Sequence, residues 1–284
     1  MIKTKPEAYA VMGYPISHSQ SPFIHQEFAK QTNQNISYSK LKVKPEELES
    51  KIQNFFQKGG KGLNITLPHK KNVVQIVDKM TTRASLAGAV NTIFLKNNLL
   101  YGDNTDGIGL IKDLQINLGF SIKNKTFLIL GAGGAAQGII CDLLGAQAAS
   151  IIITNRTHSK AKEIANAFSK FGKITACKIK NLKLLSEFNA VINTTSAGIL
   201  NDSSWIYPKD IVRPNALFYD LSYGDKYTPF IKWSLNLGAK NTKMGIGMLV
   251  EQAAESFAIW TKVQPNTKPI LAKLNKKFNK NSNP

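Results

Sequence analysis

The sequence predicts an α/β protein whose largest element is a doubly wound parallel sheet. Two observations support this prediction: short apolar segments alternate with helix-patterned segments, and a glycine-rich loop joins one strand directly to a helix. Strands that alternate with helices in this way form parallel sheets covered on both faces. The clearest candidate strands are Thr126–Leu130, Ser150–Thr154, Ala190–Asn193 and Leu217–Asp220.

The first third of the chain predicts a separate set of strands. Residues 8–13 form an apolar strand, and Ser21 followed by Pro22 has the residue types of a helix N-cap and a first helical position. Residues 62–67 alternate apolar and polar side chains, which is typical of a strand, and residues 89–95 form a further candidate.

Helix-patterned segments lie between these strands. They begin at Pro45, cover residues 108–118 and 135–144, and begin again at Met248. In each, apolar side chains recur at three- and four-residue spacing, which predicts one buried face. The lysine-rich segment after Pro265 is expected to fray.

Composition favours a cytoplasmic protein. The 284 residues are 43% hydrophobic, yet no apolar run approaches the roughly 20 residues that cross a bilayer. The N-terminus lacks the apolar core of a signal peptide. We therefore expect no membrane partner.

No metal site is expected. The two cysteines, Cys141 and Cys177, do not have the spacing of metal ligands. The four histidines share no such spacing either, and we interpret them as surface or capping residues: His18, His25, His69 and His158.

The net charge of +19 leaves two interpretations open. It suits nucleic acid or an anionic small molecule, or it reflects solvated lysines on ordinary surface faces. The lysines are scattered, and no basic stripe with interleaved aromatic residues is present. We therefore expect no nucleic-acid partner, although the sign of the charge favours anionic ligands.

The glycine-rich loop predicts a dinucleotide site. Gly131, Ala132, Gly133, Gly134 and Ala135 lie between a strand and a helix, the context in which this motif carries meaning. The first glycine permits a tight turn, the second lets a pyrophosphate approach the backbone, and the helix N-terminus offers unpaired N–H groups.

The end of the next strand predicts NADP(H) as the cofactor. An NAD site usually has an acidic residue there, which accepts a hydrogen bond from the ribose. Here Asn155, Arg156 and Thr157 follow the strand. A carboxylate would repel a 2′-phosphate, whereas the Arg156 guanidinium can pair with it.

The N-terminal third offers weaker candidates for substrate binding. Ser19 and Ser21 lie at a strand-to-helix junction, where hydroxyl and amide groups can meet an anion. Taken alone, Lys70 would be a solvated surface lysine and Asp106 a turn residue.

Together these features resemble shikimate dehydrogenases, from about Tyr9 to Trp260. Six segments carry the resemblance in order: residues 13–22, 64–70, 88–92, 102–107, 131–136 with 155–157, and 245–252. One such segment would be a weak signal, and six in order are specific.

The resemblance implies a role for each matching residue. Lys70 and Asp106 would be the catalytic pair. The substrate would contact Ser19, Ser21, Thr66, Asn91, Asp106, Tyr223 and Gln252. The cofactor would contact the glycine loop, Asn155, Arg156, Thr157, Leu221, Gly245 and Met248.

The resemblance also implies two domains. Residues 107–244 would form an NADP-binding Rossmann-type domain. Residues 1–106 and 245–284 would form a smaller, discontinuous α/β domain for substrate binding and catalysis. The oligomeric state stays open between monomer and homodimer.

The implied reaction is the reversible, NADPH-dependent reduction of 3-dehydroshikimate to shikimate, a step of chorismate and aromatic amino acid biosynthesis. One position departs from the family, because Lys160 replaces a second arginine that clamps the 2′-phosphate, and we expect weaker NADP affinity. Two rivals stay open: a quinate/shikimate dehydrogenase that uses NAD, and a basic nucleic-acid-binding protein without catalysis.

Overall fold

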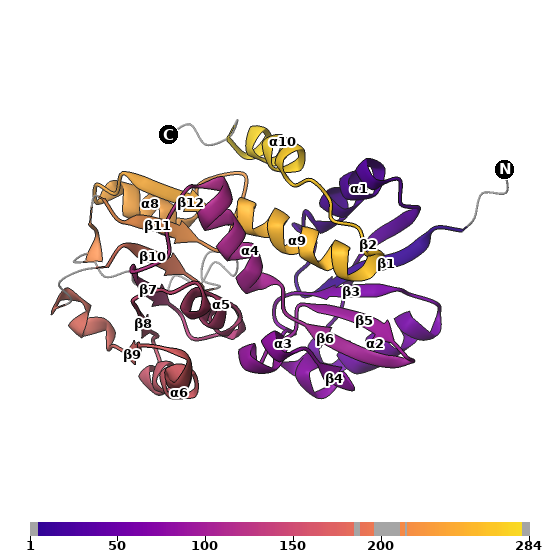
Figure 1. The fold of residues 1–284 in the computed structure, drawn as a ribbon, viewed down its shortest axis with the longest axis horizontal. Helices are drawn as coiled ribbons and strands as arrows, with labels where there is room; N and C mark the ends of the chain where they lie inside the picture. The colour runs from indigo at the N-terminus through magenta and orange to yellow at the C-terminus, as the bar shows by residue number, and fades with distance from the viewer. Residues whose placement is uncertain (1–4, 185–187, 196–210, 214, 280–284) are drawn as a thin grey trace. The chain divides into compact units, whose positions relative to one another are not determined.

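The computed structural model describes residues 5–184, 188–195, 211–213 and 215–279 (Figure 1). The chain divides into two compact units. The first contains Met1–Gly109 and Val250–Ile270, and the second contains Leu110–Leu249 and Leu271–Pro284. The N-terminal third therefore shares a unit with a segment from the last quarter of the chain.

A mixed six-stranded sheet in the order β2-β1-β3-β5-β6-β4 forms the centre of the first unit. β1 is parallel to β2 and β3, whereas β5 is antiparallel to both β3 and β6. The strands are β1 (Glu7–Gly13), β2 (Ile36–Lys42), β3 (Gly62–Ile65), β4 (Lys79–Met80), β5 (Thr92–Lys96) and β6 (Leu99–Asp103).

The strand register brings the ends of several strands to one edge of this sheet. Met12 of β1 pairs with Ile65 of β3, and Thr92 of β5 pairs with both Asn64 and Asp103. The ends of β1, β3 and β6 and the start of β5 therefore meet there. Helices α1 (Ser21–Thr32) and α3 (Thr82–Ala87) belong to this unit, as does α2 (Leu48–Gln57) after a 3₁₀ turn at Pro45–Glu47.

The second unit contains a six-stranded sheet in the order β12-β11-β10-β7-β8-β9, and every neighbouring pair in it is parallel. This confirms the predicted parallel sheet. The strands are β7 (Thr126–Leu130), β8 (Ser150–Thr154), β9 (Ile174–Ala176), β10 (Ala190–Asn193), β11 (Leu217–Asp220) and β12 (Asn241–Met244).

Alternation along β7 explains why this sheet is covered on both faces. Phe127 and Ile129 lie in one apolar core, with side chains of α5 (Gly134–Gly145) and α6 (His158–Phe168). Leu128 and Leu130 lie in a second core, with Phe230 of α8 (Pro229–Asn236). Successive side chains of a strand point to opposite faces, so an uninterrupted apolar strand is buried on both.

Two further helices connect the units along the chain. α4 (Asp106–Lys112) continues into a π-helical turn, Asp113–Asn117. α9 (Ile246–Thr261) reaches the first sheet with its later residues (Figure 1). There Asn64 Nδ2 donates to Ser256 Oγ at 3.1 Å, and Trp260 Nε1 donates to the Ile93 carbonyl at 3.2 Å.

Two local predictions are wrong. Ser21 is the first residue of α1, and the N-cap is Gln20, which makes no side-chain capping bond. The lysine-rich segment after Pro265 does not fray throughout, because α10 covers Lys268–Asn279. Its buried residues Ile270, Leu274 and Phe278 recur every fourth position, which gives the helix one apolar stripe among its lysines.

Candidate active site

Lys70 and Asp106 form an ion pair at the edge of the first sheet. Lys70 follows β3, Asp106 begins α4 after β6, and their Nζ and Oδ2 atoms are 2.5 Å apart. The Lys70 side chain is 21% exposed and the Asp106 side chain 6%. Lys70 is therefore a partly buried, paired cation rather than the solvated lysine expected from its local sequence.

Asn91 holds the other oxygen of the Asp106 carboxylate. Its Nδ2 donates to Asp106 Oδ1 and to Thr105 Oγ1, both at 2.9 Å, while its Oδ1 accepts from the Thr105 backbone N–H at 2.9 Å. Gln252 Oε1 lies 3.4 Å from both Asn91 Nδ2 and Thr105 Oγ1. Both oxygens of Asp106 are thus held, one by a cation and one by an amide.

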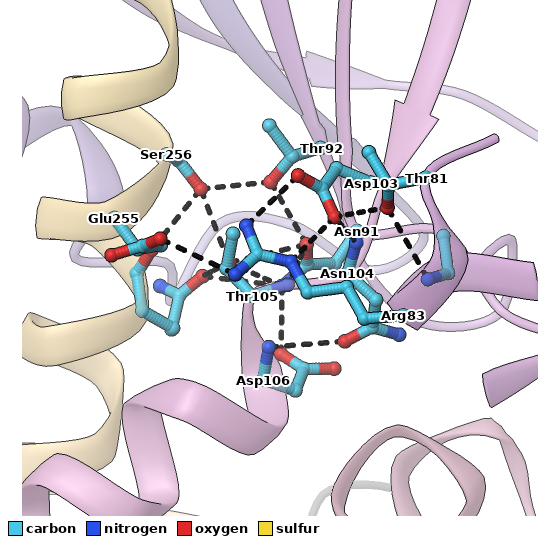
Figure 2. Close-up of polar contacts among 12 residues, drawn as sticks. Thr81, Arg83, Asn91, Thr92, Asp103, Asn104, Thr105, Asp106, Glu255 and Ser256 are labelled. Atoms are coloured by element: carbon cyan, nitrogen blue, oxygen red, sulfur yellow. Dashed lines mark hydrogen bonds and ion pairs between the residues drawn. The ribbon is translucent and has the colours of Figure 1, made fainter. Parts of the chain in front are cut away.

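A layer of buried hydroxyl and amide groups supports these residues (Figure 2). Thr92 Oγ1 lies 2.8 Å from both Asn91 Oδ1 and Ser256 Oγ. Asn64 Nδ2 donates to Thr92 Oγ1 at 3.2 Å, and its Oδ1 accepts from Tyr38 at 2.7 Å. A connected polar network of this kind restricts the orientation of each member.

Ser19, Ser21 and Thr66 lie beyond the ends of the adjacent strands β1 and β3. Both serines are buried, Ser19 Oγ donates to Ser21 Oγ at 3.2 Å, and the Ser21 backbone N–H donates to Ser19 Oγ at 3.3 Å. The Thr66 backbone N–H donates to the Met12 carbonyl at 2.9 Å. These three candidates therefore share the sheet edge with Lys70 and Asp106.

The interpretation of all four histidines as surface or capping residues is wrong for two of them. His25 and His69 are fully buried. The His25 ring stacks on Tyr38 at 4.3 Å, and burial lowers its pKa to about 3. Its position between Ile24 and Phe28 on the buried face of α1 was a signal in the sequence.

The glycine loop of the second unit has the backbone shape that its sequence predicts. Gly131 has φ +109°, and a Cβ atom there would come within 2.6 Å of Thr194 Oγ1. Gly133 is the N-cap of α5, and a Cβ added to it would meet nothing within 4 Å. Glycine at 131 is therefore required by the protein itself, whereas the space beside Gly133 is open to a ligand.

Two cationic side chains follow β8 in the second unit. Arg156 and Lys160 are both exposed, and no acidic residue lies in the first turn of α6. Asn155 Nδ2 donates to the Thr157 carbonyl at 3.0 Å, so this side chain braces the turn that carries Arg156. The turn presents positive charge beside a helix N-terminus, where anions are favoured.

Leu221, Gly245 and Met248 are close to one another beyond the ends of β11 and β12. The Gly245 N–H donates to the Ser222 carbonyl at 3.2 Å, and a Cβ at Gly245 would come within 2.5 Å of the Leu221 carbonyl. Met248 lies in the first turn of α9 and is buried. Tyr223 packs edge-on against Phe278 at 5.9 Å.

The strand order of the second sheet explains why these candidates gather. The chain runs from β7 outward to β8 and β9 in one direction, and from β10 to β11 and β12 in the other. Ligands of such sheets bind outside the carboxyl ends of the strands, where the order reverses. The glycine loop follows β7 at this reversal.

Three family models match the chain. They are described as the shikimate dehydrogenase substrate binding domain over residues 11–93, shikimate / quinate 5-dehydrogenase over residues 114–222, and the shikimate 5'-dehydrogenase C-terminal domain over residues 245–274. The chain is 44% identical to a protein from Alkalilimnicola ehrlichii, over 94% of this chain and 98% of that one. A protein from Nitrosococcus oceani is 46% identical over 96% of each. Both are named shikimate dehydrogenase (NADP(+)).

The chain belongs to the shikimate dehydrogenase family. The fold agrees: the crystal structure of shikimate 5-dehydrogenase from Thermus thermophilus, in complex with NADP(H) and shikimate, matches with a TM-score of 0.83 at 26% identity. The match covers 95% of this chain and 99% of that one. This family assignment confirms the resemblance read from the six sequence segments.

Several residues around the site of this family member were missed by the sequence analysis. Asn64, Thr105 and Ser256 are buried polar residues of the network, and Arg83 binds Asp103 beside it. Asn64 and Thr105 lie inside family segments, so their position was available, whereas nothing in the sequence singles out Arg83. Within the described residues, no three His, Cys, Asp or Glu side chains are grouped so that they could hold a metal ion. No helix of these residues is long and apolar enough to cross a membrane.

Proposed function

We propose that this protein catalyses the reversible, NADPH-dependent reduction of 3-dehydroshikimate to shikimate. The observation that carries the proposal is the Lys70–Asp106 pair, held by Asn91 in a chain of this family. We further propose that the first unit binds the substrate and the second the cofactor. The enzyme would act in the cytoplasm, as a monomer or homodimer.

Lys70 has the chemistry that ketone reduction needs. NADPH, when bound, supplies a hydride to the ketone carbon, and negative charge then grows on the ketone oxygen. A positioned ammonium group stabilises that charge and can donate a proton to it. Asp106 Oδ2 lies 2.5 Å from Lys70 Nζ and would hold this side chain in place. In the oxidative direction the pair would act in reverse and take the hydroxyl proton.

Substrate binding is assigned to polar groups at the same sheet edge. Ser19 and Ser21 would hold the substrate carboxylate with their hydroxyl groups. Thr66, Asn91 and Gln252 would bind its ring hydroxyls, and Tyr223 is a further candidate contact. The burial of Ser19, Ser21 and Asn91 supports this, because hydrogen bonds to an anion are stronger away from water.

The residues of the second unit fit a dinucleotide phosphate. The N–H groups of the glycine loop and the start of α5 suit the pyrophosphate, and the open space at Gly133 admits it. Arg156 and Lys160, with Asn155 and Thr157, would bind the 2′-phosphate. Leu221, Gly245 and Met248 would flank the nicotinamide. Lys160 supplies charge without the planar fork of arginine, so it would clamp the phosphate less tightly.

A quinate/shikimate dehydrogenase that uses NAD is the second candidate. One matching family model is described as shikimate / quinate 5-dehydrogenase, so family membership leaves the substrate choice open. The absence of an acidic residue after β8 argues against NAD, because the ribose would lack its usual carboxylate partner. A non-catalytic nucleic-acid-binding protein would have no use for the Lys70–Asp106–Asn91 arrangement.

An absorbance assay separates these candidates. The purified protein is given shikimate or quinate together with NADP or NAD, and reduced nicotinamide is followed in all four mixtures. The proposal expects the highest kcat/KM with shikimate and NADP. Comparable rates with quinate and NAD would favour the second candidate. No turnover in any mixture, with steeply salt-dependent binding of nucleic acid, would favour the third.

A further inference from the structure

Asp103 is a buried carboxylate, 4% exposed, that lies three residues before Asp106. Its two oxygens receive a forked bond from Arg83, with Nε at 2.7 Å from Oδ1 and Nη2 at 2.8 Å from Oδ2. Thr81 Oγ1 donates to Oδ1 at 2.6 Å, and the Asn104 backbone N–H donates to Oδ1 at 2.7 Å. A two-point guanidinium contact fixes the plane of a carboxylate, which a lysine cannot do.

This fixed carboxylate begins the turn that ends at Asp106 (Figure 2). The Asn104 side chain donates to the Ala89 carbonyl at 2.9 Å and accepts the Asp106 backbone N–H at 3.0 Å. The Asp103 carbonyl accepts the Asn91 backbone N–H at 3.0 Å. The backbone of Asp106 and the backbone of Asn91 are therefore both attached to the segment that Arg83 orients.

Arg83 also contacts α9, the helix that carries Gln252 and Ser256 of the polar network. Its Nη1 donates to Glu255 Oε1 of α9 at 3.3 Å. Glu255 lies three residues after Gln252 and directly before Ser256, both of which contact Thr105. Burial alone would lower the pKa of Arg83, and its bonds to Asp103 and Glu255 outweigh that effect, so the cation is retained.

We infer that Arg83 is a positioning residue, which sets the orientation of Asp106, and through it of Lys70, by clamping Asp103 and tying this turn to α9 at Glu255. The inference rests on the proposed function. Arg83 does not touch the reacting groups itself: its bonds end on Asp103 and Glu255, and the effect reaches Asp106 through Asn104. The contact with Asp103 alone would neutralise the charge of that buried carboxylate. Arg83 also binds Glu255, so one guanidinium joins two carboxylates from separate segments.

The test uses Arg83→Lys, which keeps the charge and loses the fork, with Arg213→Lys as the matched control. Arg213 lies in the second unit, where it stacks over Phe188, and has no assigned role in binding or catalysis. A misplacement of about 1 Å in a reacting group can cost about a hundredfold in rate. We expect Arg83→Lys to lower kcat for shikimate about ten- to a hundredfold, with KM changed by less than about threefold and NADP binding unchanged.

The pH dependence of kcat distinguishes positioning from simple stabilisation. If Arg83 orients the Asp106–Lys70 pair, its loss changes the contact between them, and the pH profile of kcat shifts in Arg83→Lys but not in Arg213→Lys. A folded Arg83→Lys protein with the parent's kcat and pH profile would overturn the inference and leave the proposed function intact. A parent without activity on shikimate would overturn both.

Glu255→Gln provides a second variant if Arg83→Lys does not fold. It keeps an acceptor oxygen for Arg83 and removes the charge, while the forked contact to Asp103 stays in place. We expect a smaller fall in kcat than in Arg83→Lys, about two- to fivefold. The pH profile of kcat should shift in the same direction as in Arg83→Lys. A Glu255→Gln enzyme indistinguishable from the parent in both readouts would remove α9 from the arrangement and overturn the inference as stated.

Discussion

At the scale of single residues, the proposed mechanism rests on Lys70 and Asp106. Replacing Lys70 with alanine removes the ammonium beside the reacting oxygen, and a positioned acid or base contributes about a hundred- to ten-thousandfold to rate. We expect Lys70→Ala to lose turnover by this range while it stays folded and binds NADPH. Lys79→Ala, which alters an exposed lysine of the same unit, is the control. Near-parent turnover in Lys70→Ala would remove this lysine from the mechanism.

At the same scale, we expect Arg156 to determine the preference for NADP over NAD. A charge-assisted contact with the 2′-phosphate contributes about 1.5–3 kcal/mol, and each 1.4 kcal/mol is about tenfold in affinity. We expect Arg156→Ala to lower the NADP/NAD ratio of kcat/KM about ten- to a hundredfold, chiefly through weaker NADP binding. Kinetics with NAD should hardly change. Lys162→Ala, which changes an exposed lysine of α6, should leave the ratio as in the parent. An unchanged ratio in Arg156→Ala would exclude the proposed role of Arg156.

Asp220 makes stability depend on pH. Burial raises its pKa from 3.8 to about 6, although Thr228, Ser222 and Asn193 donate hydrogen bonds to it. The folded protein therefore keeps this proton at a pH where the unfolded chain has lost it. The stabilisation is complete below about pH 4 and is lost as pH rises through about 6.

Asp220→Asn removes this titration. The free energy of unfolding of the variant, minus that of the parent, should therefore rise between about pH 4 and pH 7. Denaturant titrations across that range measure the difference. An equal trend in Asp225→Asn, which changes an exposed aspartate in the loop after β11, would show that the cause lies elsewhere.

At the scale of elements, the start of α9 depends on a glycine. A Cβ atom at Gly247 would overlap the carboxylate of Asp113, which is buried and accepts from Tyr219 at 2.6 Å. Overpacking of this kind costs about 1–3 kcal/mol. We expect Gly247→Ala to lower the Tm, and to weaken NADP binding because the first turn of α9 carries Met248.

Gly145→Ala is the matched control for this prediction. Gly145 is the last residue of α5, and a Cβ there would meet nothing within 4 Å. Alanine in a helix is more stable than glycine by about 0.5–1 kcal/mol. The Tm should therefore fall in Gly247→Ala and rise in Gly145→Ala. A Gly247→Ala protein as stable as the parent would show that Asp113 moves aside without cost.

The sequence predicted the second sheet better than the first because its central strands are largely apolar. β7, β8, β10 and β11 have the bounds expected, since each is a run of four or five largely buried residues that ends at a loop rich in glycine or polar residues. β2, β4, β6, β9 and β12 were missed. All of these except β6 are edge strands with exposed or partly exposed residues, and only pairing with a neighbouring strand defines them.

The candidate site was predictable only where family segments contain it. The local sequence around Lys70 indicates no partner, because Asp106 is 36 residues away and reaches it only through the pairing of β3, β5 and β6. Arg83 shows the remaining limit. The role inferred for Arg83 depends on its contacts with a carboxylate in β6 and another in α9. No local pattern of residue types predicts these contacts.

At the scale of the whole molecule, the chain has two units with separate cores, and we propose that one binds the substrate and the other the cofactor. The first contains the Lys70–Asp106 pair, and the second contains the glycine loop and Arg156. The net charge of +19 suits these ligands, because the substrate carboxylate and the cofactor phosphates are both anionic.

Consumption of NADPH on addition of 3-dehydroshikimate tests the central claim most directly. We expect the parent protein to oxidise one NADPH for each shikimate formed, to work far more slowly with NADH, and to lose this activity in Lys70→Ala. No consumption of NADPH with 3-dehydroshikimate, or equal rates with NADH and NADPH, would contradict the proposed reaction and its cofactor.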